Sequence, residues 1–335
     1  MSSKNMVVSF LNVGQGDATH IVFPNGEHML VDINLDRKNG GIDVIQYLED
    51  VLPKNGKKKP QLAVFVNTHP HDDHLRGIGE LAERVDIKEV WHAGHELESD
   101  KGARPSYDEF LALLKAKGDD AMQLVAKSDA FRTVGDATVH VYRPSRGVKK
   151  KMSDTDQEQV VHDECAVLKL TYGGTSILLT GDSNLGAWKS IVKHYGGDLQ
   201  AHVLSASHHG SRTFYKAATE DDEAYTEHLD AIAPETVVIS VGADNPHDHP
   251  HTDMRKEYES RASVLHTADN LTVVATVSAE GAVTLAHGDA DFQDTYQLPA
   301  PDDEKQSAAK CASAAAPAAA TLTSRTRLGD VSKTA

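Results

Sequence analysis

A run of metal-ligand residues directly after an apolar strand constrains this chain more than any other feature. Residues 62–67 form a short apolar stretch typical of a buried strand, and the sequence THPHDDH follows at once. His69, His71, Asp73 and His74 place four candidate ligands within six positions, in a loop where side chains can converge. Imidazole and carboxylate suit zinc, and also manganese or iron. The spacing favours two neighbouring metal ions over one, and the alternative is a polar surface loop with incidental histidines.

The composition supports imidazole ligands and excludes thiolate ones. The chain has 335 residues, with 19 histidines but only two cysteines, and its formal net charge is −16. A disulfide-stapled secreted scaffold or a thiolate zinc module would need more cysteine. No run approaches the roughly 20 apolar residues of a membrane-spanning helix, and the N-terminal sequence lacks a signal-peptide core. We therefore expect a cytoplasmic protein without a membrane segment, and the acidic charge predicts no extended electropositive surface for nucleic acid.

Strand and helix patterns alternate along residues 1–300, which we expect to form one domain. Each half begins with strands joined by turns and continues with alternating strands and helices, which predicts an α/β domain with two mixed sheets. Predicted helices include residues 106–117, capped by Ser106, and residues 221–229. Residues 301–335 are rich in alanine and serine, with almost no large apolar side chain. Such a segment cannot bury enough surface to fold, so we expect a flexible tail.

Five short motifs occur in a fixed order across residues 6–290. NVGQGDA (residues 12–18) and HPHDDH precede LLTGDS (178–183), SHHGS (207–211) and NPHDHP (245–250). Together they resemble the metallo-β-lactamase superfamily. Within it they are similar to the branch that holds the hydrolase domain of ComEC-type DNA-uptake proteins and stand-alone relatives, among them phosphorylcholine esterases. The resemblance implies a metal-dependent hydrolase with a four-layer αβ/βα sandwich, and metals at the open edge between its sheets.

The same resemblance implies a ligand set for two divalent ions. His69 and His71 would bind one ion, Asp73 and His74 the other, and Asp182 would bridge both. A carboxylate has two oxygens for such a bridge, and the preceding glycine leaves room for close backbone approach. Taken alone, Asp182 would instead be read as a helix cap. Zinc is the expected metal, with manganese as the alternative.

Two positions of this ligand set carry alternatives. His208 is favoured over His209 as the ligand that completes the second site, which leaves His209 nearby or at the substrate. His162 would complete the first site as a third imidazole. Its alternatives are a plain loop histidine, or Asp163 as the ligand instead.

Residues outside the ligand set are weighed in the same way. His249 could donate a proton to a leaving group or contact a phosphate. The alternative is that it belongs to an exposed histidine-rich loop without a role in the reaction. For His247 and His251 the exposed loop is favoured. Arg212 either contacts an anion or is solvated. The turn that contains Asp17 lacks the third glycine of a dinucleotide fingerprint, so it is read as a tight turn between strands with Asp17 near the site edge.

These residues together predict hydrolysis by a metal-activated water. We expect the substrate to be a phosphodiester, either a small molecule or a nucleic acid, with Asp73, His209 and His249 in catalytic roles. The phosphodiester follows from the branch resemblance, and the first alternative is an acyl bond of the lactone or thioester type. The second alternative is a non-catalytic binding protein on the same fold.

Overall fold

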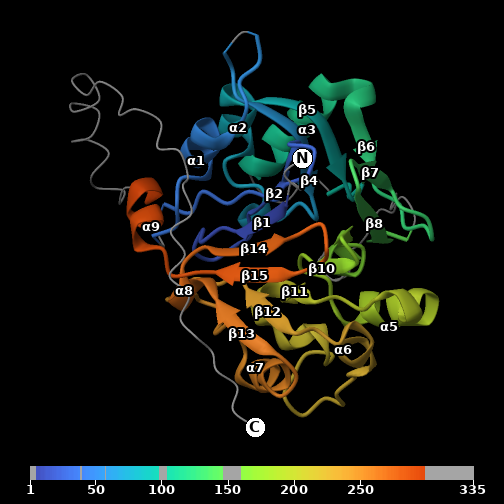
Figure 1. The fold of residues 1–335 in the computed structure, drawn as a ribbon. Helices are drawn as coiled ribbons and strands as arrows, with labels where there is room; N and C mark the ends of the chain where they lie inside the picture. The colour runs from blue at the N-terminus through green and yellow to red at the C-terminus, as the bar shows by residue number, and fades with distance from the viewer. Residues whose placement is uncertain (1–4, 38–39, 57, 98–103, 146–159, 299–335) are drawn as a thin grey trace. The chain divides into compact units, whose positions relative to one another are not determined.

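The computed structural model describes residues 5–37, 40–56, 58–97, 104–145 and 160–298. Within these ranges the chain forms two β-sheets with helices on their outer sides (Figure 1). Both sheets mix parallel and antiparallel strands, as the strand and helix patterns predict.

The first sheet has eight strands within the described ranges, in the order β15-β14-β1-β2-β3-β4-β5-β6. Strands β3 to β6 run parallel, whereas β1, β2 and β3 pair antiparallel and β14 and β15 extend the opposite edge. Its strands are β1 (Met6–Phe10), β2 (Thr19–Val22), β3 (His28–Val31), β4 (Gln61–Asn67), β5 (Asp86–His92), β6 (Ala121–Gln123), β14 (Val273–Val277) and β15 (Val283–Ala286).

The second sheet has seven described strands, in the order β13-β12-β11-β10-β9-β8-β7. Here β10 to β13 run parallel, and β7 to β10 pair antiparallel. Its strands are β7 (Arg132–Val134), β8 (Ala137–Arg143), β9 (Val167–Tyr172), β10 (Thr175–Leu179), β11 (Val203–Ser205), β12 (Thr236–Ile239) and β13 (Ser263–His266).

Helices make the crossovers that parallel strands require. Helices α1, α2 and α3 connect the parallel strands of the first sheet, and α5, α6 and α7 connect those of the second (Figure 1). Helices α8 and α9 flank the C-terminal strands. The helices are α1 (Val44–Val51), α2 (Ile78–Arg84), α3 (Pro105–Lys117), α5 (Leu185–Tyr195), α6 (Glu227–Ile232), α7 (Thr252–Glu259), α8 (Thr267–Asn270) and α9 (Ala290–Tyr296).

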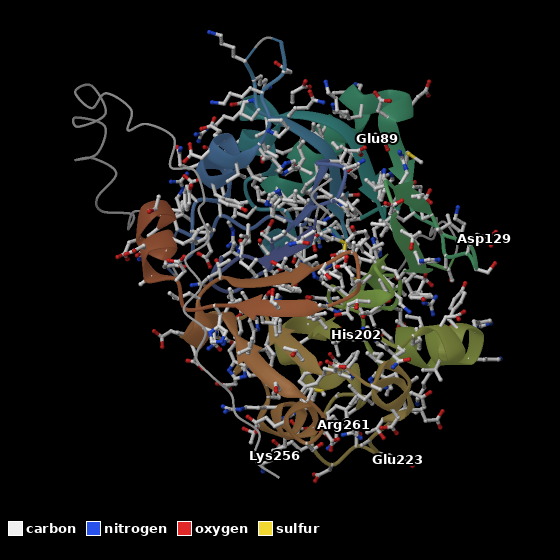
Figure 2. All side chains as sticks on the ribbon, viewed as in Figure 1. Glu89, Asp129, His202, Glu223, Lys256 and Arg261 are labelled. Carbon is white, nitrogen blue, oxygen red and sulfur yellow. The ribbon has the colours of Figure 1, made fainter. Side chains whose placement is uncertain are left out.

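Three apolar layers hold the two sheets and the helices together. One layer lies between the sheets, where Phe10 of β1 and Leu168 of β9 belong to the same buried cluster. A second cluster joins the first sheet to α1, α2 and α3, and a third joins the second sheet to α5, α6 and α7. Charged side chains such as Asp129, Glu223 and Lys256 remain at the periphery (Figure 2). This arrangement confirms the predicted four-layer αβ/βα sandwich.

The topology brings the sequence motifs to one edge of the sandwich. In each sheet the parallel strands point their carboxyl ends the same way, so the loops after them lie together. The HPHDDH loop follows β4, the LLTGDS motif ends β10, and SHHGS and NPHDHP follow β11 and β12. Side chains from all four loops therefore meet where the two sheets open.

Two predicted helices differ from the structure. Helix α3 begins at Pro105, one residue before the predicted cap Ser106, because the fixed φ of proline suits the first helical position. The helix predicted at 221–229 is wrong, since α6 begins only at Glu227. The side chain of Asp222 accepts hydrogen bonds from the backbone of residues 218 and 219, which stabilises a turn in place of the helix.

The predicted tail, residues 301–335, lies outside the described residues. Among the residues that the structure describes, no helix is long and apolar enough to cross a membrane.

Candidate metal centre

The HPHDDH loop leaves the carboxyl end of β4 and brings its side chains together. His69 and His74 are fully buried, whereas His71 and Asp73 line a surface cleft. The side-chain amide of Asn67 donates to the carbonyl of His69 at 2.7 Å, which holds the loop against the strand end. The convergence expected from the sequence is therefore present.

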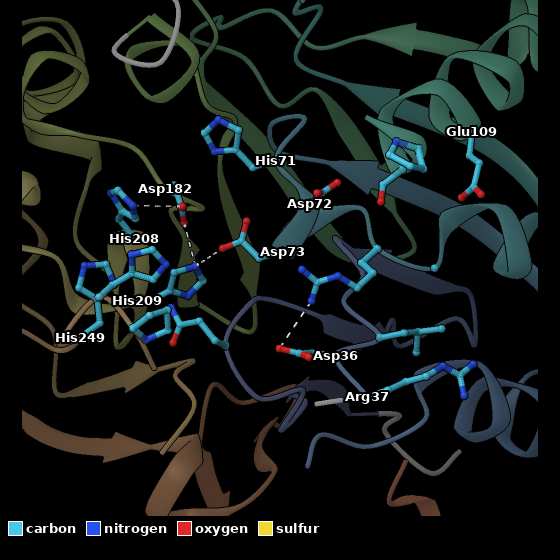
Figure 3. Close-up of a pocket in the computed structure, with 18 of the residues that line it drawn as sticks. Asp36, Arg37, His71, Asp72, Asp73, Glu109, Asp182, His208, His209 and His249 are labelled. Carbon is cyan, nitrogen blue, oxygen red and sulfur yellow. Dashed lines mark hydrogen bonds and ion pairs between the residues drawn. The ribbon is translucent and has the colours of Figure 1, made fainter. Parts of the chain in front are cut away.

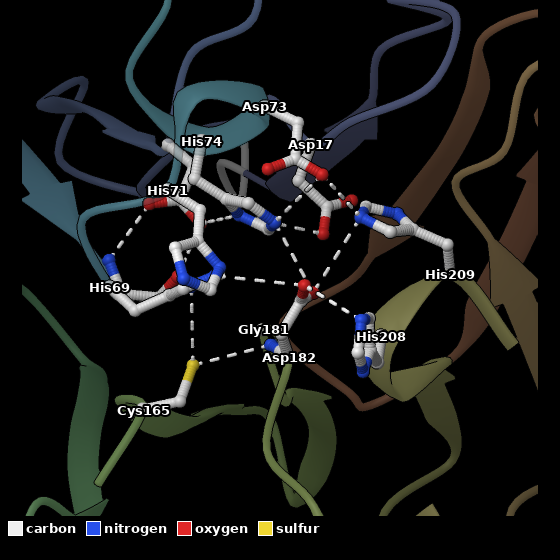
Figure 4. A network of polar contacts seen from close by, with 12 residues as sticks. Asp17, His69, His71, Asp73, His74, Cys165, Gly181, Asp182, His208 and His209 are labelled. Carbon is white, nitrogen blue, oxygen red and sulfur yellow. Dashed lines mark hydrogen bonds and ion pairs between the residues drawn. The ribbon is translucent and has the colours of Figure 1, made fainter. Parts of the chain in front are cut away.

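Histidine and aspartate side chains form two overlapping groups at this edge (Figure 4). In each group the candidate ligand atoms lie within 4.8 Å of one another, and Asp182 belongs to both. The first group is His69, His71, His162 and Asp182, and the second is Asp17, His74, Asp182 and His209.

Several polar atoms inside the second group have unmet bonding capacity. Nε2 of His74 and the Oδ1 atoms of Asp182 and Asp17 are buried without a hydrogen-bond partner among the described residues. Oδ1 of Asp182 and Nε2 of His74 form an ion pair at 3.2 Å without hydrogen-bond geometry, so neither atom has its bonding capacity met by it. Buried polar atoms left unpaired are destabilising, and imidazole nitrogen and carboxylate oxygen are ligands of divalent ions. The residues present therefore fit a dinuclear metal centre.

The two groups differ in their protonation. Burial lowers the pKa of His69 well below its ordinary value and the pKa of His162 to about 3, so these imidazoles are neutral. Burial alone would also lower the pKa of His74 and His209, but Asp182 and other carboxylates raise both, that of His209 to about 9. The first group can bind a cation as it stands, whereas the second would release protons on binding.

Asp182 reaches both groups because of the glycine before it. Gly181 has φ +48°, and a Cβ there would lie 2.6 Å from Sγ of Cys165 and 2.9 Å from Oγ1 of Thr68. Only glycine allows this close approach. The alternative reading of Asp182 as a helix cap is wrong, since Asn184 caps α5 through a hydrogen bond from the backbone of Ala187.

His162, and not Asp163, faces the first group. Nε2 of His162 lies 3.3 Å from Nδ1 of His71. Asp163 instead interacts with the side chain of Asn184 and the backbone of Ala187, at the start of α5. The structure thus places His162, the residue favoured from the sequence, in the first group. Its role as a metal ligand stays a prediction.

His209, rather than the favoured His208, lies in the second group. Nε2 of His209 is 3.7 Å from Oδ1 of Asp182, and its Nδ1 is 2.9 Å from the carbonyl of Ser240. A carbonyl only accepts, so Nδ1 donates to it, and this turns Nε2 toward the group, where it would bind a metal after releasing its own proton. His208 places its Nε2 3.6 Å from Oδ2 of Asp182, on the side of His162. Both assignments remain predictions.

Asp73 lies at the mouth of the second group. Its Oδ2 is 3.2 Å from Nε2 of His209 and 4.0 Å from Nε2 of His74, and its side chain is 30% exposed. Burial alone would raise the pKa of Asp73, but His74 and the hydrogen bond from His209 lower it. Asp17, which the sequence placed only near the site edge, lies inside the group.

Asp32 contacts the ligand candidate His74 and was not predicted from the sequence as part of the site. It follows β3, is 1% exposed, and has φ +57°. Its Oδ2 is 2.7 Å from Nδ1 of His74 and accepts a 2.5 Å hydrogen bond from the Thr68 hydroxyl, while Oδ1 accepts from the Thr68 backbone at 2.8 Å. Such a carboxylate orients a ligand histidine and directs its other nitrogen to the metal. The sequence signal is a charged residue within the apolar stretch of residues 29–33.

A cleft of about 870 Å³ opens over both groups (Figure 3). One wall carries His208, His209 and His249, and the other carries Arg37 and Glu109. The two arginines of the lining already face carboxylates, since Arg37 lies 3.6 Å from Glu80 and Arg76 lies 3.6 Å from Asp36. The cleft therefore offers no unopposed arginine among the described residues.

The NPHDHP loop places His249 in this cleft. Asn245 accepts hydrogen bonds from the backbone of His247 and His249 and donates to the carbonyl of His249, which folds the loop. Nδ1 of His249 is buried without a hydrogen-bond partner among the described residues, and its ring lies 5.4 Å from that of His208. His247 is exposed but also lines the cleft. His249 therefore reaches the side where a substrate would bind.

Arg212 lies in an ion-pair cluster outside the cleft lining. Its guanidinium is 3.2 Å from Asp253 and 2.9 Å from Glu220, and its backbone N–H donates to Nδ1 of His251. Neither reading of Arg212 from the sequence describes this arrangement, because its guanidinium is paired with carboxylates of the protein itself and not with a bound ligand or with solvent alone.

A family comparison agrees with this fold and centre. The model of the metallo-beta-lactamase superfamily matches residues 12–228, which is more than half of the chain. The chain belongs to the metallo-β-lactamase superfamily. Members of this superfamily are metal-dependent hydrolases that use a dinuclear metal centre. The two overlapping groups of this metallo-hydrolase lie where such a centre would form.

Curated relatives point to one branch of the superfamily. The chain is 37% identical over 84 residues to competence protein ComA of Neisseria gonorrhoeae, which covers 25% of this chain and 11% of that protein. It is 25% identical over 288 residues to ComE operon protein 3 of Bacillus subtilis, covering 79% of this chain and 32% of that protein. The chain thus spans a third or less of these relatives. The matches are consistent with the ComEC-like branch.

Two solved structures share a distant similarity with the chain. The metallo-β-lactamase fold protein YhfI of Bacillus subtilis is 14% identical with a TM-score of 0.45, over 84% of this chain and all of that chain. Igni18, a metallo hydrolase from Ignicoccus hospitalis, is 15% identical with a TM-score of 0.43, over 80% of this chain and 98% of that chain.

Proposed function

We propose that this metallo-β-lactamase superfamily member hydrolyses phosphodiesters at a dinuclear zinc centre, with manganese as the alternative metal. The observation that carries the proposal is a pair of ligand groups that share Asp182 on the floor of an open cleft. Three imidazoles and one carboxylate in the first group suit zinc. The choice of a phosphodiester follows the ComEC-like branch to which the relatives belong.

Residues around this centre would have separate roles in the reaction. When bound, two ions would activate a water molecule and stabilise charge on the phosphoryl oxygens. Asp32 holds His74 in place through its Nδ1, and Ser240 does the same for His209. Asp73 stands at the mouth of the second group, between the buried ligands and the cleft. His249 borders the cleft, where it would hydrogen-bond the substrate phosphate or protonate the leaving group.

The cleft favours a small phosphodiester over an extended nucleic acid. A nucleic-acid strand carries a charge on every phosphate and needs several unopposed lysines or arginines. Arg37 and Arg76, the arginines of the lining, each lie within 4 Å of a carboxylate. The formal net charge of −16 adds repulsion. We therefore place the nucleic acid second among phosphodiester substrates.

Replacing His249 with alanine should lower turnover and leave the metals in place. A group that positions or protonates a phosphate contributes about 10²-fold or more, and His249 belongs to neither ligand group. We expect kcat to fall about 10²-fold with two metal equivalents retained, measured by steady-state kinetics and elemental analysis. Asp248→Asn is the matched control, because Asp248 is exposed in the same loop and asparagine tolerates its φ of +55°. Full activity of the alanine variant would remove His249 from the mechanism.

A substrate panel tests the reaction class. Metal-free protein is reconstituted with zinc or manganese and offered an aryl phosphodiester, a lactone, a thioester, and single- and double-stranded DNA. We expect the aryl phosphodiester to be hydrolysed with a kcat/KM at least about 10²-fold above the lactone and thioester, because two adjacent metal ions suit an in-line displacement at phosphorus, where both the attacking and the leaving oxygen need stabilisation.

Any other result of the substrate panel would support one of the alternative functions. Preferential hydrolysis of the lactone or thioester would support an acyl hydrolase. Bound metal with no turnover of any ester would support a binding protein on the same fold. DNA cleavage that falls steeply with salt would support a nuclease, because phosphate contacts are lost as salt rises.

A further inference from the structure

Asp17 is a buried carboxylate that the sequence reading left without a role. It lies in the turn between β1 and β2 and is 8% exposed. One carboxylate oxygen lies within 4.8 Å of the candidate ligand atoms of His74, Asp182 and His209. Its Oδ1 is buried without a hydrogen-bond partner among the described residues. In Figure 4, Asp17 and Asp73 lie side by side above Asp182.

The turn holds Asp17 in this position. Gly16 has φ +146°, and a Cβ there would lie 2.4 Å from Nδ2 of Asn34 and 2.5 Å from the carbonyl oxygen of Asp73. The Asp17 backbone N–H donates to that same carbonyl at 3.1 Å, and the Asn34 side chain donates to the carbonyl of Gln15 at 2.8 Å. The glycine thus permits a close contact that fixes Asp17 to the HPHDDH loop.

No cation among the residues that the structure describes is paired with this carboxylate alone. Oδ2 of Asp17 lies 3.9 Å from Nδ1 of His74. That nitrogen already faces Asp32 at 2.7 Å, so its proton is directed elsewhere. His209, the other cationic imidazole of the group, contacts Asp73 through its Nε2. A buried ionised carboxylate whose cations already serve other carboxylates is unfavourable, and such groups pair with charges or coordinate metals.

We propose that Asp17 is a carboxylate ligand of the second metal ion, together with His74, His209 and the shared Asp182. The inference rests on the proposed dinuclear centre and adds a ligand from outside the HPHDDH loop. Asp73, which is nearer the cleft, then approaches the same ion from the open side. The second site is therefore richer in oxygen ligands than the first, where three imidazoles join Asp182.

Metal binding by Asp17→Asn tests this assignment without reference to activity. Metal-free full-length protein is titrated with zinc against a chromophoric chelator, and the bound zinc is counted by elemental analysis. We expect two equivalents for the wild type. For the variant we expect one unchanged equivalent and a second whose affinity falls at least about 10²-fold, since loss of supporting partners alone reaches that size. Asp72→Asn is the matched control, because Asp72 is exposed in the cleft and outside both groups.

Two results would overturn the proposal. If Asp17→Asn binds both ions with wild-type affinity, Asp17 is not a ligand, although the dinuclear centre stands. If the wild type itself binds fewer than two ions, the dinuclear centre fails and this inference fails with it. Should the variant not fold, a crystal of zinc-loaded wild type decides the matter. A carboxylate oxygen of Asp17 at about 2.0–2.2 Å from the second ion supports the proposal, and one beyond 3 Å contradicts it.

Discussion

Replacing Asp182 with alanine is expected to remove bound metal and activity together. Its carboxylate belongs to both ligand groups, with Oδ2 3.6 Å from Nε2 of His69 and Oδ1 3.2 Å from Nε2 of His74. Without it each group loses a charged ligand, and several imidazoles are left facing one another. We expect less than one metal equivalent after dialysis and a fall in kcat of about 10³-fold or more, because water activation and charge stabilisation are lost at once. Elemental analysis and phosphodiester kinetics on one sample measure both.

Asp163→Asn is the matched control for this loss. Asp163 is a neighbouring acidic residue, but it serves the start of α5 and belongs to neither ligand group. The control should keep both metal equivalents and its turnover within about threefold of the wild type. Circular dichroism shows whether each variant is folded. A folded Asp182→Ala protein that keeps its metals or its turnover would contradict the shared-ligand account.

Asp32→Ala should lower both the stability of the protein and its metal affinity, although Asp32 belongs to neither ligand group. The substitution leaves Nδ1 of His74 and the Thr68 hydroxyl and backbone N–H without their acceptor. Breaking such a buried charged network typically costs about 3–5 kcal/mol of unfolding free energy. Loss of the partner that orients a ligand histidine lowers metal affinity about 10–100-fold. Urea unfolding of the metal-free protein and zinc titration measure the two effects separately.

Two further variants distinguish the loss of the partner that orients His74 from a general loss of protein stability. Asp32→Asn keeps the side-chain shape and tolerates φ +57°, so it should fold better than the alanine variant while still losing the charge opposite His74. Asp269→Ala, at a side chain that is 77% exposed, should change stability by less than about 0.5 kcal/mol. Unchanged stability and unchanged zinc affinity in Asp32→Ala would mean that Asp32 does not support His74.

Features set by neighbouring residues could be predicted from the sequence. The buried strand β4 and the loop after it were recognisable because the apolar stretch and the four candidate ligands all lie within 13 consecutive positions, residues 62–74. The two mixed sheets followed from alternating strand and helix patterns, and the family resemblance supplied their stacking. The helix error at 221–229 arose where a single side chain, Asp222, stabilises a turn, which residue periodicity does not report.

Features set by distant contacts could not be predicted. His208 and His209 both have positive φ, so no strand or helix periodicity tells which ring turns toward Asp182. Asp17 enters the second group only because its turn packs against the HPHDDH loop through Gly16. Asp32 acts through residues about 40 positions away, so its place within an apolar stretch marks it as unusual but does not show which residues it contacts. The ligand candidates were therefore visible in the sequence, whereas their supporting residues required the structure.

The most direct test of a dinuclear phosphodiesterase is turnover as a function of zinc content. Metal-free wild-type protein is loaded in steps from zero to three equivalents, and hydrolysis of an aryl phosphodiester is measured at each step. Two groups that share Asp182 predict activity that rises mainly between the first and second equivalent and reaches a plateau at two. A plateau at one equivalent, or no hydrolysis with two ions bound, would contradict this account.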